Sequence, residues 1–192
     1  MMLTMSLHKG RDRRLLSLLD RRTPTSVTEV SWARPLRIST YVGAADLPDE
    51  LVTSVRCLVV VNDDIVVCTT AAGRVHTWPG GRRVAGEDHE ATAAREVHEE
   101  TGWLIDPDGV ASIGFLHLYN LGEPLAPYPH PDTLQLVVVA SASTRAADDW
   151  SDVEGYEVSS RLVPLNQAQQ LVSAEEPMCL PFLQHVLESR VD

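Results

Sequence analysis

Short apolar runs rich in β-branched residues alternate with turn signals along most of this chain, a pattern typical of a β-sheet protein. The run at 55–61 indicates a buried central strand, and the turn cluster at 62–64 makes 65–70 its expected hairpin partner. Further strands are expected at 74–78, 111–120, 133–141 and 161–164. The Pro-rich segment 121–132 cannot join a sheet interior, because proline has no backbone N–H to donate.

A helix is expected at residues 88–101. Asp88 is a suitable N-cap, Glu90 favours the helix dipole in the first turn, and Gly102 ends the helix. Small apolar residues recur at three-residue spacing and form a face that can pack on a sheet: Ala91, Ala94 and Val97. Two more helices are expected at 166–172 and 181–190. The order of elements predicts a mixed α/β arrangement around one sheet and no regular βαβ alternation.

Charge is distributed unevenly. The net charge is −11 at pH 7, yet residues 1–37 hold eight Lys or Arg and only three acids, so the rest of the chain carries −16. We therefore expect a basic, loosely ordered extension at 1–34, followed by one domain at 35–192. The extension contains a candidate amphipathic helix within 1–22, and a helix that binds a membrane surface or a partner is the alternative interpretation. The acidic body argues against binding a nucleic-acid polymer.

The three cysteines form no CxxC pair and no even-numbered disulfide framework, which favours a reduced, cytoplasmic setting. No apolar run reaches the ~18 residues that a membrane span needs, and no apolar segment of signal-peptide type follows the basic N-terminus. We expect no membrane association.

Three carboxylates fall on one side of the expected helix. Glu96, Glu99 and Glu100 are three or four positions apart, and Glu87 stands near the helix start. Like charges at this spacing destabilise an isolated helix. A cluster of hard oxygen ligands suits Mg²⁺, or Mn²⁺, better than Zn²⁺. The alternative is a solvated acidic helix face without function.

The residues around this cluster stand at spacings that resemble a known family motif. Gly81 is followed after five residues by Glu87, and seven residues later comes a run in which Arg95-Glu96-Val97, Glu99-Glu100 and Gly102-Trp103 stand in fixed positions. The segment Gly81 to Trp103 resembles the signature motif of the Nudix hydrolase family. Trp103 departs from it, since the family usually has an aliphatic residue there.

The resemblance implies an α/β/α sandwich with a mixed sheet and Mg²⁺-dependent hydrolysis of a nucleoside diphosphate linked to another group. Glu96, Glu99 and Glu100 would bind the metal, together with the backbone carbonyl of Gly81 or its neighbour Gly80. Glu96 would instead, or in addition, help to activate the water, and Arg95 would orient the carboxylates by ion pairing.

The remaining site residues are less constrained by the motif. Candidates for contacts with a nucleotide-like substrate are Arg82, Arg83, Trp78 and Tyr128, with Tyr119 and His130 as further aromatic candidates. His117 is expected to be a strand residue satisfied by its neighbours. Candidates for a general base outside the motif are Asp132, Glu154 and Glu157.

Two other functions remain open. A nucleotide-sensing module of Nudix type would bind without cleaving, but such modules usually lose motif acids. An isomerase acting on a diphosphate ester would need acid and base residues that the sequence does not identify. A homodimer is also expected from the resemblance.

Overall fold

The computed structural model describes residues 10–31, 33–146, 150, 156–172 and 177–189. Within these ranges the strands form a nine-stranded sheet in the order β1-β2-β7-β8-β3-β4-β5, with β6 paired to β8 and β9 paired to β4. The strands are β1 (Ser26–Ser31), β2 (Pro35–Val42), β3 (Val52–Val61), β4 (Asp64–Thr70), β5 (Val75–His76), β6 (Trp103–Ile105), β7 (Ala111–Asn120), β8 (Asp132–Arg145) and β9 (Glu157–Pro164). The helices are α1 (Arg13–Leu19), α2 (His89–Thr101), α3 (Leu165–Val172) and α4 (Leu180–Glu188), with short 3₁₀ turns η1 (Asp49–Leu51) and η2 (Pro107–Gly109).

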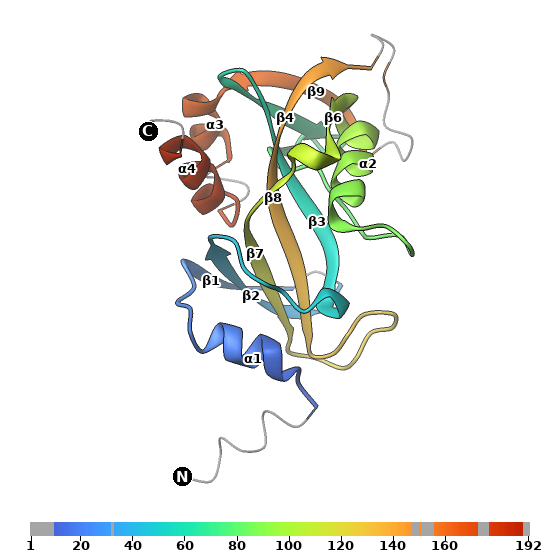
Figure 1. Ribbon diagram of the computed structural model, residues 1–192, viewed down its shortest axis with the longest axis vertical. Coiled ribbons are helices and arrows are strands. Elements are labelled where there is room, and N and C mark those ends of the chain that lie inside the picture. Colours follow the sequence, from blue (N-terminus) through green and yellow to red (C-terminus); the bar gives the residue numbers. More distant parts are fainter. Residues whose placement is uncertain (1–9, 32, 147–149, 151–155, 173–176, 190–192) are drawn as a thin grey trace.

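Helices cover both faces of the sheet, so the protein has three layers (Figure 1). Strand β3 shows why, because its side chains alternate between two hydrophobic clusters. Leu58 and Val60 belong to the cluster that includes α3 and α4, whereas Cys57 and Val59 belong to the cluster that includes α2. A strand buried on both faces reads as a continuous apolar run. Among the described strands only β3 and β8 pair in parallel, so the sheet is mixed, and the expected α/β/α sandwich is confirmed.

Helix α2 follows the local signals in the sequence. The Asp88 side chain accepts a hydrogen bond from the backbone N–H of Ala91, and Gly102 ends the helix in the left-handed conformation at φ 73°. The buried residues on the sheet side include Ala93 and Val97. Ala91 and Ala94 are only partly buried, which differs from the expected three-residue face because the helix turns 100° per residue.

Several strand ends differ from the sequence prediction. Strand β5 is shorter than the expected 74–78, because the chain leaves β4 before Pro79, and proline cannot continue a ladder of N–H donors. Strand β9 begins at Glu157, not at 161, because it pairs with nearly the whole of β4. Strand β8 likewise extends over 132–145, since its far end pairs with β6.

The described part of the N-terminal extension is folded, unlike the loosely ordered segment expected from composition. Helix α1 buries Leu15 completely in the cluster that also contains α2 residues. Strand β1 pairs with β2, and β2 pairs with β7. Apolar burial and backbone pairing account for this order. The domain boundary at residue 34 stays a prediction.

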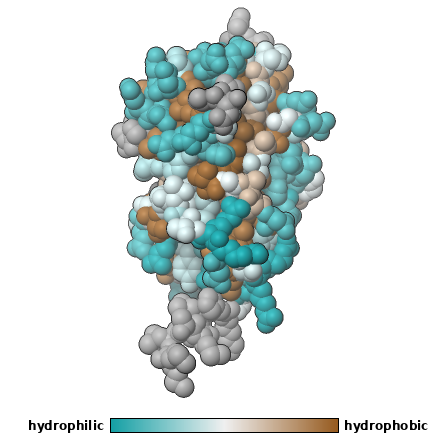
Figure 2. All heavy atoms as spheres, turned by 60° about the vertical axis from the view of Figure 1, so that its left-hand side comes forward, coloured by the Kyte–Doolittle hydropathy of each residue, from teal (hydrophilic) through white to brown (hydrophobic). Residues whose placement is uncertain are grey.

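The surface mixes hydrophobic and hydrophilic residues. Figure 2 shows brown hydrophobic groups interspersed with teal hydrophilic residues on the face that it displays. None of the helices in the described ranges is long and apolar enough to span a membrane.

Candidate active site

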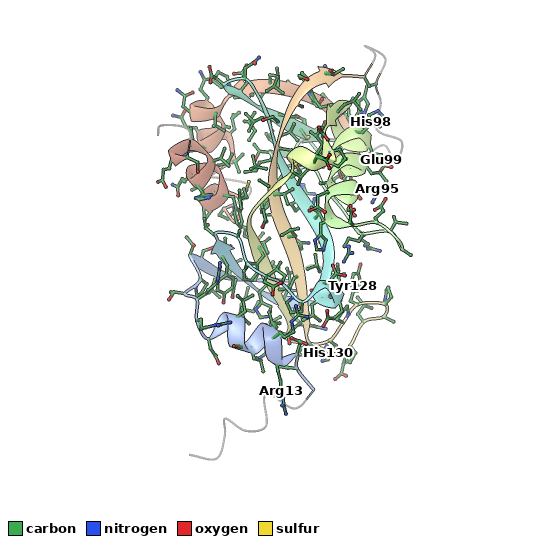
Figure 3. All side chains as sticks on the ribbon, in the orientation of Figure 1. Arg13, Arg95, His98, Glu99, Tyr128 and His130 are labelled. Atoms are coloured by element: carbon green, nitrogen blue, oxygen red, sulfur yellow. The ribbon has the colours of Figure 1, made fainter. Side chains whose placement is uncertain are left out.

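The carboxylates of α2 are tied together by one guanidinium. Arg95 Nε and Nη2 donate to the two oxygens of Glu87 at 2.7 and 3.1 Å. Arg95 Nη1 donates to Glu96 Oε1 at 2.9 Å and to Glu99 Oε2 at 3.0 Å. A planar guanidinium with five N–H groups can bridge several carboxylates, which an ammonium group cannot do in fixed geometry. Figure 3 shows Arg95 and Glu99 projecting from the same helix.

Two glycines bring the loop before α2 against these acids. The backbone N–H of Gly80 donates to Glu100 Oε2 at 2.9 Å. Gly80 has a φ of 149°, and a Cβ there would lie 2.1 Å from the carbonyl oxygen of Val55. A Cβ on Gly81 would lie 2.5 Å from Glu96 Oε1. Gly80 therefore needs glycine, because the backbone of strand β3 is too close for a side chain, whereas a side chain at Gly81 would displace the Glu96 carboxylate.

The acids differ in pKa because they differ in environment. Hydrogen bonds from Arg95 lower the pKa of Glu87 to about 2. Burial raises the pKa of Glu100 to about 7, although the Gly80 N–H and the positive charge of Arg56 oppose the shift. Burial also raises the pKa of Glu96. The site thus holds two carboxylates whose charged forms lack full compensation.

The residues fit a hard cation by chemistry. The donors are carboxylate oxygens and the carbonyls of Gly80 and Gly81, which suit Mg²⁺ or Mn²⁺. Each carbonyl already accepts one hydrogen bond, Gly80 from Arg56 and Gly81 from the Val55 N–H, and each keeps a second lone pair. Across the described ranges, however, no three His, Cys, Asp or Glu side chains converge as a ready-made metal cluster. Arg95 pairs with Glu96 and Glu99 and occupies the space between them.

Three adjoining cavities surround this cluster. The carboxylate cavity, about 490 Å³, is lined by Arg82, Arg95, Glu96, Glu99 and Glu100 among others. The histidine cavity, about 440 Å³, shares Glu100 with it and contains His76 and Glu157. The arginine cavity, about 410 Å³, shares Gly81 and Arg82 with the carboxylate cavity and contains Arg34 and Tyr128. Arg56 lines both the histidine and the arginine cavity.

Comparison with models of protein families gives one match. Residues 50–180 match the NUDIX domain family. The chain belongs to the Nudix hydrolase family. No curated protein matches it.

Solved structures share the fold of this Nudix protein. A mutant of the Bacillus subtilis pyrophosphohydrolase BsRppH is 15% identical with a TM-score of 0.56, and the alignment covers 80% of this chain and 92% of that one. A NUDIX hydrolase from Nitrosomonas europaea is 16% identical with a TM-score of 0.50, over 70% of this chain and 84% of that one.

Trp103, where the chain departs from the Nudix motif, lies away from the three cavities. Trp103 lies in β6 opposite Arg145 of β8, and it is partly buried against the hydrophobic cluster on the α2 side of the sheet. It is not among the residues that line the three cavities described above.

The substrate candidates separate into two groups. Arg82 and Tyr128 line the arginine cavity, and Trp78 lines the histidine cavity while packing 6.3 Å from the ring of Phe182. Arg83 points elsewhere: its Nη1 pairs with Asp49 at 2.9 Å.

Tyr119 and His130 line a different cavity near Arg11, which shares no lining residue with the carboxylate cavity. In Figure 3, His130 lies below Tyr128, farther from α2.

The base candidates also separate. Asp132 is buried, forms two hydrogen bonds with Arg11 at 2.6 and 2.7 Å, and lies 2.7 Å from His117 Nε2. It lines none of the three cavities around the cluster. Glu157 lies in the histidine cavity, with its Oε1 2.9 Å from His76 Nε2. Glu154 lies outside the described residues.

Two site residues were missed by sequence reasoning. Arg56 had a local signal, because it is the single charge within the apolar run at 55–61. A charge in such a run is rarely buried without a partner. His76 had none, because its partner Glu157 is 81 residues away and meets it only through the pairing of β4 with β5 and β9.

Proposed function

We propose that this protein hydrolyses a diphosphate linkage in a nucleoside diphosphate joined to another group, with Mg²⁺ as cofactor and Mn²⁺ as a substitute. The observation that carries the proposal is the cluster of Glu96, Glu99 and Glu100. It opens into a cavity, it contains desolvated carboxylates that a cation would compensate, and it stands in the family's motif.

Glu96, Glu99 and Glu100 would hold the metal, with the carbonyl of Gly81 or Gly80 as a further ligand. The metal, when bound, neutralises phosphate charge and lowers the pKa of a bound water. Arg95 would keep Glu96 and Glu99 in position through the fork that it forms with them and with Glu87. In a chain with net charge −11, this neutralisation also lets a polyanionic substrate approach.

Glu157 is the candidate that we propose as general base outside the motif. It lines the same cavity as Glu100, so the two acids border one space that a water could enter. His76 would fix the orientation of the Glu157 carboxylate through their 2.9 Å contact. Proton acceptance by a positioned carboxylate contributes typically ~10²–10⁴-fold to rate.

The test is turnover of a substrate panel by the purified protein with Mg²⁺. The panel contains nucleoside triphosphates, ADP-ribose, dinucleoside polyphosphates and sugar nucleotides, and release of phosphate or nucleoside monophosphate is measured. We expect turnover that EDTA abolishes and that Glu100→Gln lowers by ~10³-fold or more. Glu90→Gln is the matched control, because Glu90 is exposed in the first turn of the same helix, and its activity should equal wild type.

An active Glu100→Gln variant would contradict the metal-ligand assignment. Thermal stabilisation by a panel member without any turnover would favour a nucleotide-sensing module. On present grounds the intact acids Glu87, Glu96, Glu99 and Glu100 favour the enzyme. A cytoplasmic location and a homodimer remain part of the proposal, to be tested by fractionation and by light scattering.

A further inference from the structure

The arginine cavity has an unusual charge for this chain. Three of its lining residues are arginines, Arg34, Arg56 and Arg82, and none of the described residues lining it is Asp or Glu. The chain as a whole has 27 acids against 16 bases, so a cavity with three cations and no anion is far from the average composition. A concave site lined by one sign of charge focuses the field and attracts the opposite charge.

These three guanidiniums also differ from the other arginines of the site in their partners. Arg95 pairs with three carboxylates, and Arg83 pairs with Asp49. Within the described part of the chain, no carboxylate forms an ion pair with the three cavity arginines. Arg56 also interacts electrostatically with Glu96 and Glu100, so Arg34 and Arg82 are the two arginines whose charge an anionic ligand would mainly meet.

Tyr128 positions two of these arginines. The guanidinium carbon of Arg34 lies 4.6 Å from the centroid of the Tyr128 ring, and that of Arg82 lies 5.3 Å from it. A cation over an aromatic face is attracted by about 0.5–1 kcal/mol at exposed sites. The ring therefore acts as a platform that holds two forked donors at the cavity, although they come from separate segments of the chain.

A buried hydroxyl points to a ligand independently of these charges. Ser54 is 6% exposed and lines the arginine cavity, and its Oγ is buried without a hydrogen-bond partner among the described residues. Buried polar atoms are nearly always paired, so an unpaired one indicates a missing partner. Gln135 and Thr133 add further polar groups to the wall.

The arginine cavity adjoins the carboxylate cavity at Gly81 and Arg82. The carbonyl oxygen of Arg82 accepts a hydrogen bond from Arg95 Nη2 at 3.0 Å, and Gly81 and Arg82 line both cavities. In the view of Figure 3, Tyr128 lies below Arg95 and Glu99. A ligand whose diphosphate lies at the carboxylates can thus extend into the arginines.

We propose that the arginine cavity is a subsite for a phosphate group beyond the cleaved diphosphate linkage, so that the enzyme prefers nucleoside triphosphates and other polyphosphate chains over nucleotide sugars. This specificity rests on the proposed hydrolysis. Arg34, Arg56 and Arg82 neutralise and grip the additional phosphate, because guanidiniums donate two parallel hydrogen bonds to phosphate oxygens. The Ser54 hydroxyl donates to the same group. A neutral sugar would leave the three guanidiniums uncompensated.

Arg34→Gln and Tyr128→Leu test the subsite without touching the carboxylate cluster. Arg14→Gln is the matched control, because Arg14 is exposed in α1 and lies 4.0 Å from Asp46. KM and kcat are measured with a nucleoside triphosphate and with ADP-ribose. Loss of one charge-assisted hydrogen-bond pair corresponds to about a tenfold change. We expect both variants to raise KM for the triphosphate about tenfold, with kcat within about twofold and with KM for ADP-ribose unchanged.

A second measurement is independent of turnover. The unfolding temperature of the metal-free protein in EDTA is followed as inorganic phosphate replaces chloride at constant ionic strength. Stabilisation of wild type and of Arg14→Gln, with its loss in Arg34→Gln and Tyr128→Leu, would support the subsite even if no panel substrate were cleaved. Equal phosphate stabilisation in all four proteins, or equal rises in KM for both substrates, would overturn it.

Discussion

Glu100→Gln should stabilise the metal-free protein while abolishing its turnover. Burial raises the pKa of Glu100 from 4.5 to about 7, so the folded state disfavours the charged carboxylate. One pKa unit corresponds to about 1.36 kcal/mol, so the shift corresponds to a penalty of about 3 kcal/mol once the group is ionised. The amide removes the charge, and its oxygen can still accept the hydrogen bond that the Gly80 N–H now donates at 2.9 Å.

The pH dependence has a defined sign. Between pH 4.5 and about 7 the folded protein binds more protons at Glu100 than the unfolded chain does, so wild-type stability falls as the pH rises. The advantage of the variant is therefore absent below pH 4.5, grows through this window and is constant above it. At pH 8 it corresponds to about 6–12 °C in unfolding temperature for a chain of this size.

Thermal unfolding in EDTA at several pH values between 5 and 8 measures this difference. Glu99→Gln is the matched control: it makes the same change one position earlier, but removes the 3.0 Å ion pair with Arg95 and should give no gain. Addition of Mg²⁺ should stabilise wild type and reduce or reverse the gap, because binding to the folded state stabilises it by mass action. A Glu100→Gln protein that is no more stable than wild type at pH 8 would refute the reasoning.

Three further variants and one control test positions at the site and away from it. Arg95→Lys replaces a fork by a point charge that cannot hold Glu87 and its neighbours together, so kcat/KM should fall about 10–100-fold in steady-state assays. Gly80→Ala should lower the free energy of unfolding by about 3 kcal/mol in urea titrations, whereas Gly86→Ala, with a positive φ but open space, should lower it by about 1 kcal/mol. Asp132→Asn should lower it by about 3 kcal/mol with kcat unchanged, since it breaks a buried ion pair away from the cluster. Hydrogen bonds from His117 and Arg11 outweigh burial and lower the pKa of Asp132, so this contribution is present above pH 3.8 and is lost as the pH falls.

Local signals predicted helix α2 and its ends. Asp88, Gly102 and the spacing of the acids act within one or two turns, so periodicity and capping chemistry are readable without tertiary structure. Strand β7 likewise begins and ends where its apolar pattern predicted, at 111–120. Strand β9 was predicted too short, because its first half is ordered by pairing with β4 and not by its own apolar residues.

Side-chain direction at the site was not predictable in the same way. Arg82 and Arg83 are neighbours with identical chemistry, yet one lines the arginine cavity and the other pairs with Asp49. Consecutive residues of an extended segment point to opposite sides. The β-bridge between Ser54 and Arg82 fixes which of the two arginines points toward the arginine cavity. That bridge joins segments 28 positions apart, so no local pattern encodes it.

The basic N-terminal segment acquires a physical explanation from the same long-range contacts. Residues 1–37 carry a net charge of +5, and the rest of the chain carries −16. Some of the N-terminal arginines form contacts within the fold. Arg11 compensates the buried Asp132, and Arg34 stands on Tyr128 at the arginine cavity. Both arginines precede the family match at 50–180. The family motif thus accounts for the proposed cleavage chemistry, whereas the proposed choice of a polyphosphate substrate depends on a residue outside that match, which no motif would have placed at the site.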